Sequence, residues 1–538
     1  MRVLILVLAT SLLTAQVTPS RLEKAASEPQ NWLTYNGSYA STHYSGLTQI
    51  TPANVASLEL KWVWQARSLE KLETTPLVVD GVMYLTEPPN NIVALDARSG
   101  RVFWMYRHEL PQVTYPCCGA VNRGLAILGD TLFMGTMDAR LIAVDARTGR
   151  KKWDVVVADY TKGISVTLAP LVVKDKVIIG TAGGEYGIQG FISAYDAATG
   201  KEVWKFRTIP RPGEPGSETW ENDGWKHGSG SAWVTGSYDP ALNLVYWGTG
   251  NPGPDWNPSA RPGDNLYTDC VIALDADTGQ KKWHFQFTPH DEWDWDAVQV
   301  PVLADMEWQG RPRRLMLWGN RNGFFYVLDR TNGEFLMGKP FVKQTWAKGL
   351  NAKGRPIRVP GMGPSAEGTE VWPGVQGGTN WYAPSFSPRT KLFYLQTWDD
   401  YHGTFFTWNQ EYEQGKWYAG GSVKAALPAT RREPILKWGP DAGYGAVRAL
   451  DPFTGERKWE FRMADVSESG ILSTASDVVF TGNREGHFFA LDAKDGKLLW
   501  RTYLGGQVIA SPISFALDGK QYISIASGSA IFTFALRD

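Results

Sequence analysis

The sequence predicts an all-β fold, an eight-bladed β-propeller with tryptophan-docking repeats, and two observations carry this prediction. Seven copies of Asp-x-x-x-Gly each close an apolar run, and in six of them a Trp stands eight residues after the Asp. The 538 residues also include 25 Trp and 56 Gly, a composition that favours aromatic packing between sheets and tight turns. Repeats of roughly 40–50 residues, each a short sheet that cannot bury itself alone, are typical of a propeller.

The repeats can be followed along the chain by their Asp and Trp residues. The six complete pairs are Asp96/Trp104, Asp145/Trp153, Asp196/Trp204, Asp275/Trp283, Asp451/Trp459 and Asp492/Trp500. The remaining copy, at Asp329, keeps Gly333 but has Met337 in the Trp position. Between the turns, β-branched and aromatic residues alternate as they do in strands. We expect each Trp to dock over the next blade, where its large ring contributes much of the burial.

The spacing between repeats indicates the number of blades. Most neighbouring Asp residues are 41 to 79 positions apart, but Asp329 and Asp451 are separated by 122. That gap leaves room for two blades, and we expect residues 386–396 to belong to the middle one, whose Asp-x-x-x-Gly is degraded. Eight blades follow, with seven as the alternative. Residues 58–64 would pair with the C-terminal strands and close the ring, leaving no open sheet edge. The Gly/Pro-rich residues 343–378 are expected to form a surface excursion near one end of the ring axis.

The N-terminus predicts export from the cytoplasm. A single long apolar run, residues 3–13, follows Arg2; it is too short to span a bilayer and is typical of a secretory signal peptide. We expect a signal peptide over residues 1–15 and one propeller domain over residues 16–538, located in the periplasm. A buried N-terminal segment is the alternative. A formal net charge of −1 argues against a nucleic-acid-binding face.

Three blades carry polar residues at equivalent turns. These turns read Gly183-Gly184-Glu185, Gly250-Asn251 and Asn320-Arg321. Because equivalent positions in a ring of blades face the same end of the axis, we expect Glu185, Asn251 and Arg321 to converge on one site. The alternative is that each residue was selected for the backbone conformation of its turn.

An acidic segment, residues 290–296, reads His-Asp-Glu-Trp-Asp-Trp-Asp. In an extended chain, Asp294 and Asp296 point to the same side. With Glu185 and the amide oxygen of Asn251 they make an all-oxygen, strongly anionic ligand set, which suits a hard cation such as Ca²⁺ better than Zn²⁺ or Cu²⁺. Three carboxylates exceed the charge of Ca²⁺ and favour a trivalent ion. A solvated acidic loop is the alternative.

The three cysteines do not form a disulfide framework, and no C-x-x-C-H motif occurs, so we expect no covalently attached haem in this chain. Cys117 and Cys118 are adjacent, with Cα atoms about 3.8 Å apart, so a disulfide between them would be strained. Two free buried thiols are the alternative. Arg123 follows five residues later and adds a fixed cation that can bind a carboxylate bidentately.

In combination, these residues resemble the pyrroloquinoline-quinone (PQQ)-dependent alcohol dehydrogenases, the methanol and ethanol dehydrogenase family. The resemblance covers nearly the whole mature chain. The motifs that carry it are Cys117-Cys118 with Arg123, Gly183-Gly184-Glu185, Gly250-Asn251-Pro252 and His290-Asp291-Glu292-Trp293-Asp294.

The resemblance implies a role for each residue of the site. Cys117 and Cys118 would form a vicinal disulfide against one face of the quinone, and Trp233 would stack on the other face. The remaining residues expected to bind the quinone are Arg123, Thr167, Gly183, Gly184, Ser231, Arg321, Asn380 and Trp381. The expected metal ligands are Glu185, Asn251, Asp294 and Asp296, and Asp294 would also be the catalytic general base.

Asp296 bears on the identity of the metal. Lanthanide-dependent members of the family carry Asp at this position, whereas calcium-dependent members carry a small residue, and Gly184 gives room beside Glu185. We therefore expect one lanthanide(III) ion, with Ca²⁺ as the alternative.

The resemblance implies a periplasmic enzyme that oxidises a primary alcohol to the aldehyde by hydride transfer to metal-bound PQQ. Electrons would pass to a separate, soluble cytochrome c. Two alternatives remain: a dehydrogenase of the same fold that acts on sugars or aldehydes, and a non-catalytic propeller scaffold. Neither a membrane span nor a nucleic-acid partner is expected, and a homodimer is compatible with the resemblance.

Overall fold

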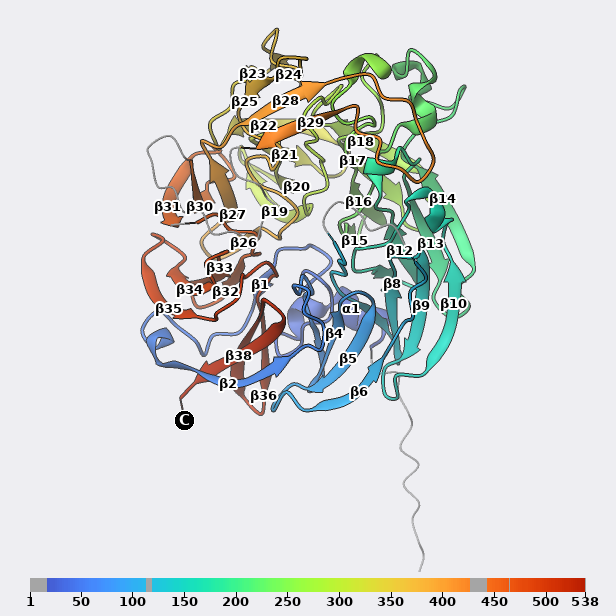
Figure 1. The fold of residues 1–538 in the computed structure, drawn as a ribbon. Coiled ribbons are helices and arrows are strands. Elements are labelled where there is room, and N and C mark those ends of the chain that lie inside the picture. The colour runs from blue at the N-terminus through green and yellow to red at the C-terminus, as the bar shows by residue number, and fades with distance from the viewer. Residues whose placement is uncertain (1–16, 113–118, 426–442, 464, 538) are drawn as a thin grey trace, which may run out of the picture.

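The computed structural model describes residues 17–112, 119–425, 443–463 and 465–537. The predicted signal peptide over residues 1–15 lies outside the described residues, as do Cys117 and Cys118. The described chain has an all-β, propeller-type fold in which four-stranded antiparallel sheets succeed one another around a ring (Figure 1). Within it, helical structure is limited to α1 (Pro19–Glu23) and short 3-10 turns. The prediction of an all-β fold is confirmed.

In the part of the chain that the structure describes, five sheets each consist of four consecutive strands. They are β3 (Leu77–Val79), β4 (Val82–Glu87), β5 (Asn91–Asp96) and β6 (Val102–Tyr106); β7 (Ala126–Leu128), β8 (Thr131–Gly135), β9 (Arg140–Asp145) and β10 (Lys151–Val156); β11 (Leu171–Val173), β12 (Lys176–Gly180), β13 (Phe191–Asp196) and β14 (Glu202–Arg207); β15 (Ser237–Asp239), β16 (Leu244–Gly248), β17 (Cys270–Asp275) and β18 (Lys281–Gln286); and β19 (Val302–Trp308), β20 (Arg311–Gly319), β21 (Phe324–Asp329) and β22 (Glu334–Pro340).

Three further sheets draw strands from distant parts of the sequence. They are β26 (Ser385–Ser387), β27 (Leu392–Asp399), β30 (Tyr444–Leu450) and β31 (Arg457–Met463); β1 (Tyr44–Ser45) with β32 (Leu472–Thr474), β33 (Val478–Gly482), β34 (His487–Asp492) and β35 (Leu498–Tyr503); and β2 (Leu58–Gln65) with β36 (Ile513–Leu517), β37 (Lys520–Ser527) and β38 (Ala530–Leu536). Two small sheets lie outside this series: β23 (Ala347–Leu350) with β24 (Pro356–Arg358), and β25 (Thr369–Val371) with β28 (Gly403–Thr407) and β29 (Gly421–Ala425).

Five of the six repeat Trp residues dock on the glycine of the next Asp-x-x-x-Gly turn, as predicted, whereas Trp500, after which no such turn follows, packs against Phe534. A Cβ atom added to Gly149, at the end of the β9–β10 turn, would lie 2.6 Å from the ring of Trp104. The indole nitrogen of Trp104 donates to the carbonyl of Ala146 at 3.1 Å. The same contact between an indole ring and a glycine occurs for Trp153 on Gly200, Trp204 on Gly279, Trp283 on Gly333 and Trp459 on Gly496.

The exceptional Met337 occupies the same place as the repeat Trp residues. Its sulfur lies 3.1 Å from the position of a Cβ atom on Gly455, the glycine of the next repeat. The Met337 thioether and the aliphatic stem of Lys339, whose Cγ atom lies 2.6 Å from the same position, therefore fill the space that an indole ring fills elsewhere.

The N-terminal strand closes the ring, as predicted. β2 pairs antiparallel with β38, from Leu58 opposite Leu536 to Gln65 opposite Ala530. Trp62 of β2 then docks on Gly100 and donates from its indole nitrogen to the carbonyl of Ala97 at 3.2 Å. The sheet that joins both ends of the chain thus obtains its docking Trp from the N-terminal strand.

One prediction for the region between Asp329 and Asp451 is wrong. Residues 386–396 do not belong to a separate repeat with its own degraded turn; they contribute β26 and β27 to the sheet whose turn is Asp451. The long gap arises because β25, β28 and β29 are inserted around β27, before β30 continues the sheet. Residues 343–378, expected to form a surface excursion, contain the β23–β24 pair and β25, which lie outside the eight larger sheets.

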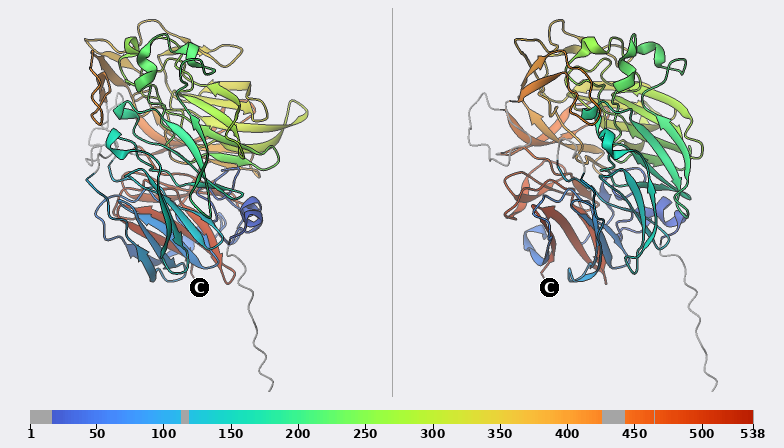
Figure 2. Two further views of the ribbon diagram at one scale, coloured as in Figure 1. Left: turned by 90° about the vertical axis from the view of Figure 1, so that its right-hand side faces the viewer. Right: turned by 45° about the vertical axis from the view of Figure 1, so that its right-hand side comes forward.

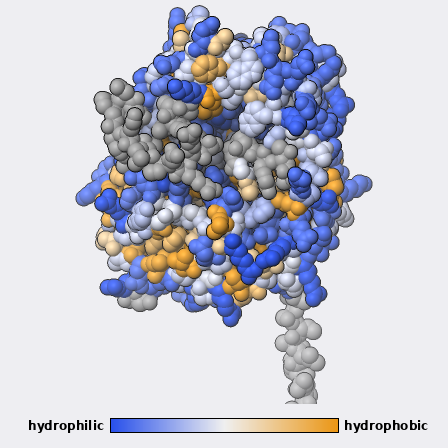
Figure 3. Space-filling model, viewed as in Figure 1, coloured by the Kyte–Doolittle hydropathy of each residue, from blue (hydrophilic) through white to orange (hydrophobic). Residues whose placement is uncertain are grey.

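The two ends of the ring differ. Figure 2 shows α1 on one side of the ring and the inserted strands β28 and β29 on the other. The face seen in Figure 3 is mostly hydrophilic, with hydrophobic residues gathered in its lower part. In the described ranges, no helix is both long enough and apolar enough to cross a membrane.

Candidate functional site

A large cavity lies among the turns that follow the strands, and it has a volume of about 1620 Å³ including the part open to solvent. Residues as distant in sequence as Arg123 and Trp381 line it. Every predicted site residue of the described chain is among its lining residues: Arg123, Thr167, Gly183, Gly184, Glu185, Ser231, Trp233, Asn251, Asp294, Asp296, Arg321, Asn380 and Trp381. The structure brings these residues together, while their individual roles stay predictions. The vicinal disulfide of Cys117 and Cys118 also stays a prediction, because both cysteines lie outside the described residues.

The topology explains why three distant turns meet. Glu185 lies in a 3-10 turn (Gly184–Tyr186) after β12, Asn251 follows β16, and Arg321 follows β20. Each of these strands is the second strand of its sheet, and the three sheets are consecutive in the chain. Equivalent strand ends therefore deliver the three side chains to one end of the ring.

Asp296 is the most connected carboxylate of the cavity and is 6% exposed. Its Oδ1 atom accepts the backbone N–H of Asn251 at 3.0 Å. Its Oδ2 atom accepts from Arg321 Nη1 at 2.6 Å and from Trp233 Nε1 at 3.3 Å. One carboxylate thus joins loops next to two neighbouring sheets, β15–β18 and β19–β22.

Asp294 is held at a bend in the chain and remains accessible from the cavity. Its φ angle is +62°, and its side chain is 27% exposed. The Oδ2 atom lies 3.7 Å from Arg321 Nη2. A carboxylate that is open to the cavity and close to a fixed cation can exchange a proton with a bound molecule.

The buried carboxylates raise one another's pKa. Burial, reinforced by the charge of Glu185, raises the pKa of Asp255 to about 8. Burial also raises the pKa of Asp294 and of Asp296, although the Arg321 guanidinium opposes both shifts. On this wall of the cavity, the single Arg321 guanidinium thus faces more carboxylates than it can neutralise.

The donor set suits a multivalent cation, although its arrangement is not a coordination shell. Four carboxylates, those of Glu185, Asp255, Asp294 and Asp296, line the cavity with the Asn251 amide and the Arg321 guanidinium. Asn251 donates from Nδ2 to Asp255 Oδ1 at 2.8 Å, so its amide oxygen points away from that contact. Among the residues that the structure describes, no three His, Cys, Asp or Glu side chains are arranged to hold a metal ion. Asp296 is paired with Arg321 instead.

Another part of the cavity lining is built around Arg123, which is 4% exposed. Its Nη2 atom lies 3.0 Å from Glu73 Oε2, and its Nη1 atom donates to Thr167 Oγ1 at 3.2 Å. Its guanidinium carbon lies 4.9 Å from the ring centroid of Trp233 and 4.4 Å from that of Trp381. A cation between two indole faces is held by cation–π attraction and by its ion pair.

Two glycines are required where backbone segments approach the site. Gly183 has φ +113°, and a Cβ atom there would lie 2.1 Å from the carbonyl oxygen of Gly163. A Cβ atom on Gly250 would lie 2.2 Å from Asp296 Oδ1, so this glycine lets the Asp296 carboxylate reach the Asn251 amide.

Several lining residues escaped sequence reasoning: Glu70, Lys71, Glu73, Asp255, Gln376, Glu468 and Gln507. Asp255 stands only four positions after Asn251, so its carboxylate could have been found from the same motif. Glu73 lies in a segment without a recognisable motif, and only the fold brings it to Arg123.

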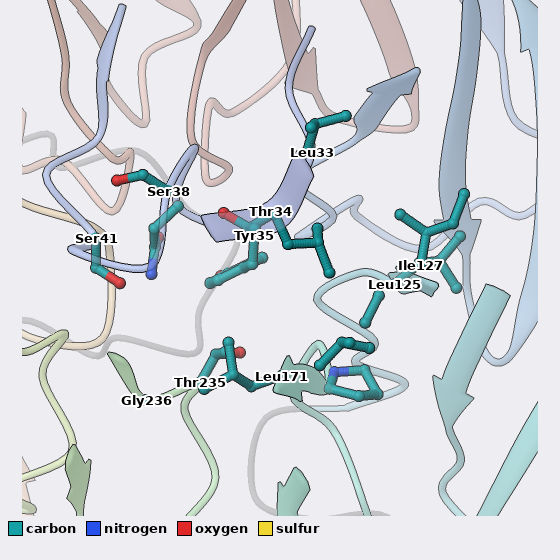
Figure 4. A pocket seen from close by; sticks show the side chains of 15 residues that line it. Leu33, Thr34, Tyr35, Ser38, Ser41, Leu125, Ile127, Leu171, Thr235 and Gly236 are labelled. Atoms are coloured by element: carbon teal, nitrogen blue, oxygen red, sulfur yellow. The ribbon is translucent and has the colours of Figure 1, made fainter. Parts of the chain in front are cut away.

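A second, smaller cavity lies between the N-terminal segment and the first strands of neighbouring sheets (Figure 4). It has a volume of about 350 Å³ including the part open to solvent, and its labelled lining includes Leu33, Thr34, Tyr35, Leu125 and Thr235. This lining contains no carboxylate, lysine, arginine or histidine. Of these two cavities, the large one alone is lined by charged side chains.

Two family models match the chain. The model described as the PQQ glucose/ethanol/alcohol dehydrogenase β-propeller domain matches residues 32–349. The model described as outer membrane protein assembly factor BamB matches residues 443–535.

Full-length comparisons agree with the first model. The chain is 39% identical to quinohemoprotein alcohol dehydrogenase ADH IIB of Pseudomonas putida, over 98% of this chain and 77% of that protein. It is 37% identical to a 1-butanol dehydrogenase (cytochrome c) of Thauera butanivorans, over 92% of this chain and 74% of that protein. Among solved structures, a europium-containing methanol dehydrogenase superposes with a TM-score of 0.90 and 34% identity, covering 96% of this chain and all of the other.

Proposed function

Because the chain belongs to the family of PQQ-dependent alcohol dehydrogenases, we propose that it oxidises a primary alcohol to the aldehyde. The observation that carries this proposal is the meeting of Asp294, Asp296 and Arg321 on one cavity wall. That wall offers a carboxylate that can take up a proton beside a guanidinium that can stabilise developing negative charge.

The residues of the cavity have separate tasks in this proposal. Bound PQQ would accept the hydride of the alcohol carbon, and a bound metal ion would polarise its carbonyl group. Asp294 accepts the hydroxyl proton of the alcohol on its carboxylate, which is open to the cavity. Arg321 orients the carboxylates of Asp294 and Asp296. Arg123, with Thr167 and the indole rings of Trp233 and Trp381, holds the anionic cofactor in another part of the cavity.

We further propose that the metal is a lanthanide(III) ion held by Glu185, Asn251, Asp294 and Asp296. The excess of carboxylates over cations on this wall supports a trivalent ion, because Coulomb attraction grows with the charge of the ion. The similar solved structure contains europium. Binding such an ion requires Asp296 to share its carboxylate between the metal and Arg321.

The same proposal includes the cellular setting and the architecture. A signal peptide over residues 1–15 would direct the protein to the periplasm. The cytochrome c in the name of the Thauera butanivorans relative supports a separate cytochrome c as the electron acceptor. Residues 16–538 would form one propeller of eight blades, a number supported by the eight sheets of four or five strands in the described ranges.

The decisive experiment is a dye-linked alcohol oxidation assay on metal-free protein supplied with PQQ and either La³⁺ or Ca²⁺. We expect turnover of primary alcohols only when PQQ and a metal are both present, and faster turnover with La³⁺. Activity on sugars but not on alcohols would mean that the protein is a sugar dehydrogenase, since the family description also names glucose dehydrogenases. Absence of turnover on alcohols, aldehydes and sugars under all conditions would refute the proposal.

A further inference from the structure

We propose that Arg261 is a positioning residue that sets the distance between the loop carrying Asn251 and the loop carrying Asp294. This inference rests on the proposed function, because it assigns Arg261 to the metal and proton-accepting site of that function. Arg261 itself does not line the large cavity.

The Arg261 side chain is fully buried and bridges two loops. Its Nη2 atom donates to the carbonyl of Asp255 at 3.0 Å and to the carbonyl of Asp291 at 2.6 Å. Its Nε atom donates to the carbonyl of Pro254 at 3.0 Å, and its Nη1 atom donates to Asn265 Oδ1 at 3.2 Å. A planar guanidinium holds such acceptors in a fixed geometry, which a lysine ammonium does not.

Through the first loop, Arg261 influences the orientation of Asn251. Asp255, whose carbonyl is bound by Arg261, accepts the Asn251 side-chain N–H on its Oδ1 atom at 2.8 Å. This contact decides which way the Asn251 amide faces. Arg261 therefore fixes the orientation of a predicted metal ligand through one intermediate residue.

The loop that carries Asp294 is also positioned by Arg261. Asp291 accepts the backbone N–H of Trp293 on Oδ1 at 3.2 Å and that of Trp295 on Oδ2 at 2.9 Å. These two amides flank Asp294, which adopts φ +62°. A residue held at positive φ needs support from its surroundings, and the Asp291 carboxylate supplies it from a position set by Arg261.

All four side-chain hydrogen bonds of Arg261 go to neutral oxygen atoms. A buried arginine that served only to neutralise a carboxylate would contact one. The pattern therefore indicates a clasp between two backbone segments.

The test compares Arg261→Gln with wild-type protein by calorimetric titration of La³⁺ into PQQ-supplied samples. Residues that orient metal ligands typically change affinity by about 10–100-fold, and we expect a loss in this range. Arg330→Gln is the matched control, because Arg330 is also buried and binds Asp239 at the end of β15 and backbone carbonyls of β19 and β20, none of which lines the large cavity. If both variants bind La³⁺ with wild-type affinity, the inference is wrong.

Arg261→Lys tests whether the planar geometry of the guanidinium or only its positive charge matters. This variant also replaces Arg261→Gln in the titration if the Gln variant does not fold. Lysine keeps the positive charge but loses the planar fork, so we expect weakened La³⁺ binding here as well. Wild-type affinity in Arg261→Lys would overturn the inference.

A measurement on wild-type protein needs no variant. If Arg261 holds the loops in advance, the amide hydrogens of Trp293 and Trp295 exchange slowly in metal-free protein and change little when La³⁺ is added. Fast exchange that slows only on metal binding would overturn the inference. If these amides exchange slowly but the protein oxidises no alcohol, the proposed function is wrong, whereas the role of Arg261 in joining the two loops still holds.

Discussion

Arg321 contacts both Asp296 and Asp294, with its Nη1 atom 2.6 Å from Asp296 Oδ2 and its Nη2 atom 3.7 Å from Asp294 Oδ2. The two carboxylates come from one acidic segment, whereas Arg321 follows β20 of the next sheet. One guanidinium thus spaces two like charges that would otherwise repel each other. Because the contact to Asp296 is the shorter one, Asp294 is the carboxylate left more open to the cavity.

Replacement of Asp296 tests its role in metal selection. The attraction of a carboxylate is about one and a half times as strong for a trivalent ion as for a divalent ion at the same distance. Asp296→Ala should therefore raise the La³⁺ concentration needed for half-maximal activity by at least about 10-fold, and the Ca²⁺ concentration by clearly less. Metal titrations of alcohol oxidation measure both values.

The control for this prediction is Asp264→Ala, which removes a surface carboxylate paired with Arg355. That variant should respond to both metals as wild type does. Equal losses for La³⁺ and Ca²⁺ in Asp296→Ala would mean that Asp296 does not select the metal.

Replacement of Asp294 separates proton transfer from binding. Asn has nearly the same shape but cannot accept the alcohol proton, so Asp294→Asn should lower turnover by about 10²–10⁴-fold. PQQ should remain bound, because its proposed contacts at Arg123 and Trp233 are unchanged. Turnover and the absorbance of PQQ retained after gel filtration give the two readouts. Turnover near the wild-type rate would exclude Asp294 as the general base.

The Trp-docking repeats could be predicted because each repeat has its own turn motif and its own Trp at a fixed distance in the sequence. The same is true of the cavity residues that follow equivalent strands, such as Glu185 and Asn251. The placement of residues 386–396 could not be predicted, because an insertion between β27 and β30 separates strands of one sheet. Arg261 and Glu73 escaped for a related reason: their partners are backbone carbonyls or distant side chains, which leave no local pattern.

The docking of Trp104 on Gly149 predicts the cost of adding one methyl group. Gly149 has φ +72°, and its Cβ atom would lie 2.6 Å from the indole ring. Positive φ costs an L-residue about 1–2 kcal/mol, and overpacking adds about 1–3 kcal/mol. Gly149→Ala should therefore lower the free energy of unfolding by about 2–5 kcal/mol, as measured by urea denaturation.

Gly310→Ala is the matched control, because Gly310 has φ +76° and its Cβ atom would meet nothing within 4 Å. It should show only the backbone part of the loss. If the two variants lose the same free energy of unfolding, the contact between the indole ring and the added methyl group does not destabilise the protein, and the docked Trp does not stabilise the turn.

His43 predicts an acid-dependent loss of stability that is unrelated to the large cavity. The imidazole is fully buried, and its Nε2 atom lies 2.8 Å from the carbonyl oxygen of Pro512, to which it donates. Burial lowers the pKa of His43 from 6.5 to about 4, and the hydrogen bond to Pro512 opposes this shift only in part. The unfolded chain therefore binds a proton at His43 below pH ~6.5 that the folded protein does not bind.

The sign of the effect follows from this difference in proton binding. The stabilising contribution is fully present above pH ~6.5 and is lost progressively as the pH falls toward ~4, with a total of about 3 kcal/mol. His43→Asn keeps an N–H donor, tolerates the positive φ of this position and does not titrate. Urea denaturation at pH 4.5, 5.5 and 7 should show a smaller decline in the variant than in wild type. Since burial also lowers the pKa of His284 to about 4, part of the decline should persist until His284→Asn is added. Parallel declines in wild type and His43→Asn would show that the buried imidazole does not control acid stability.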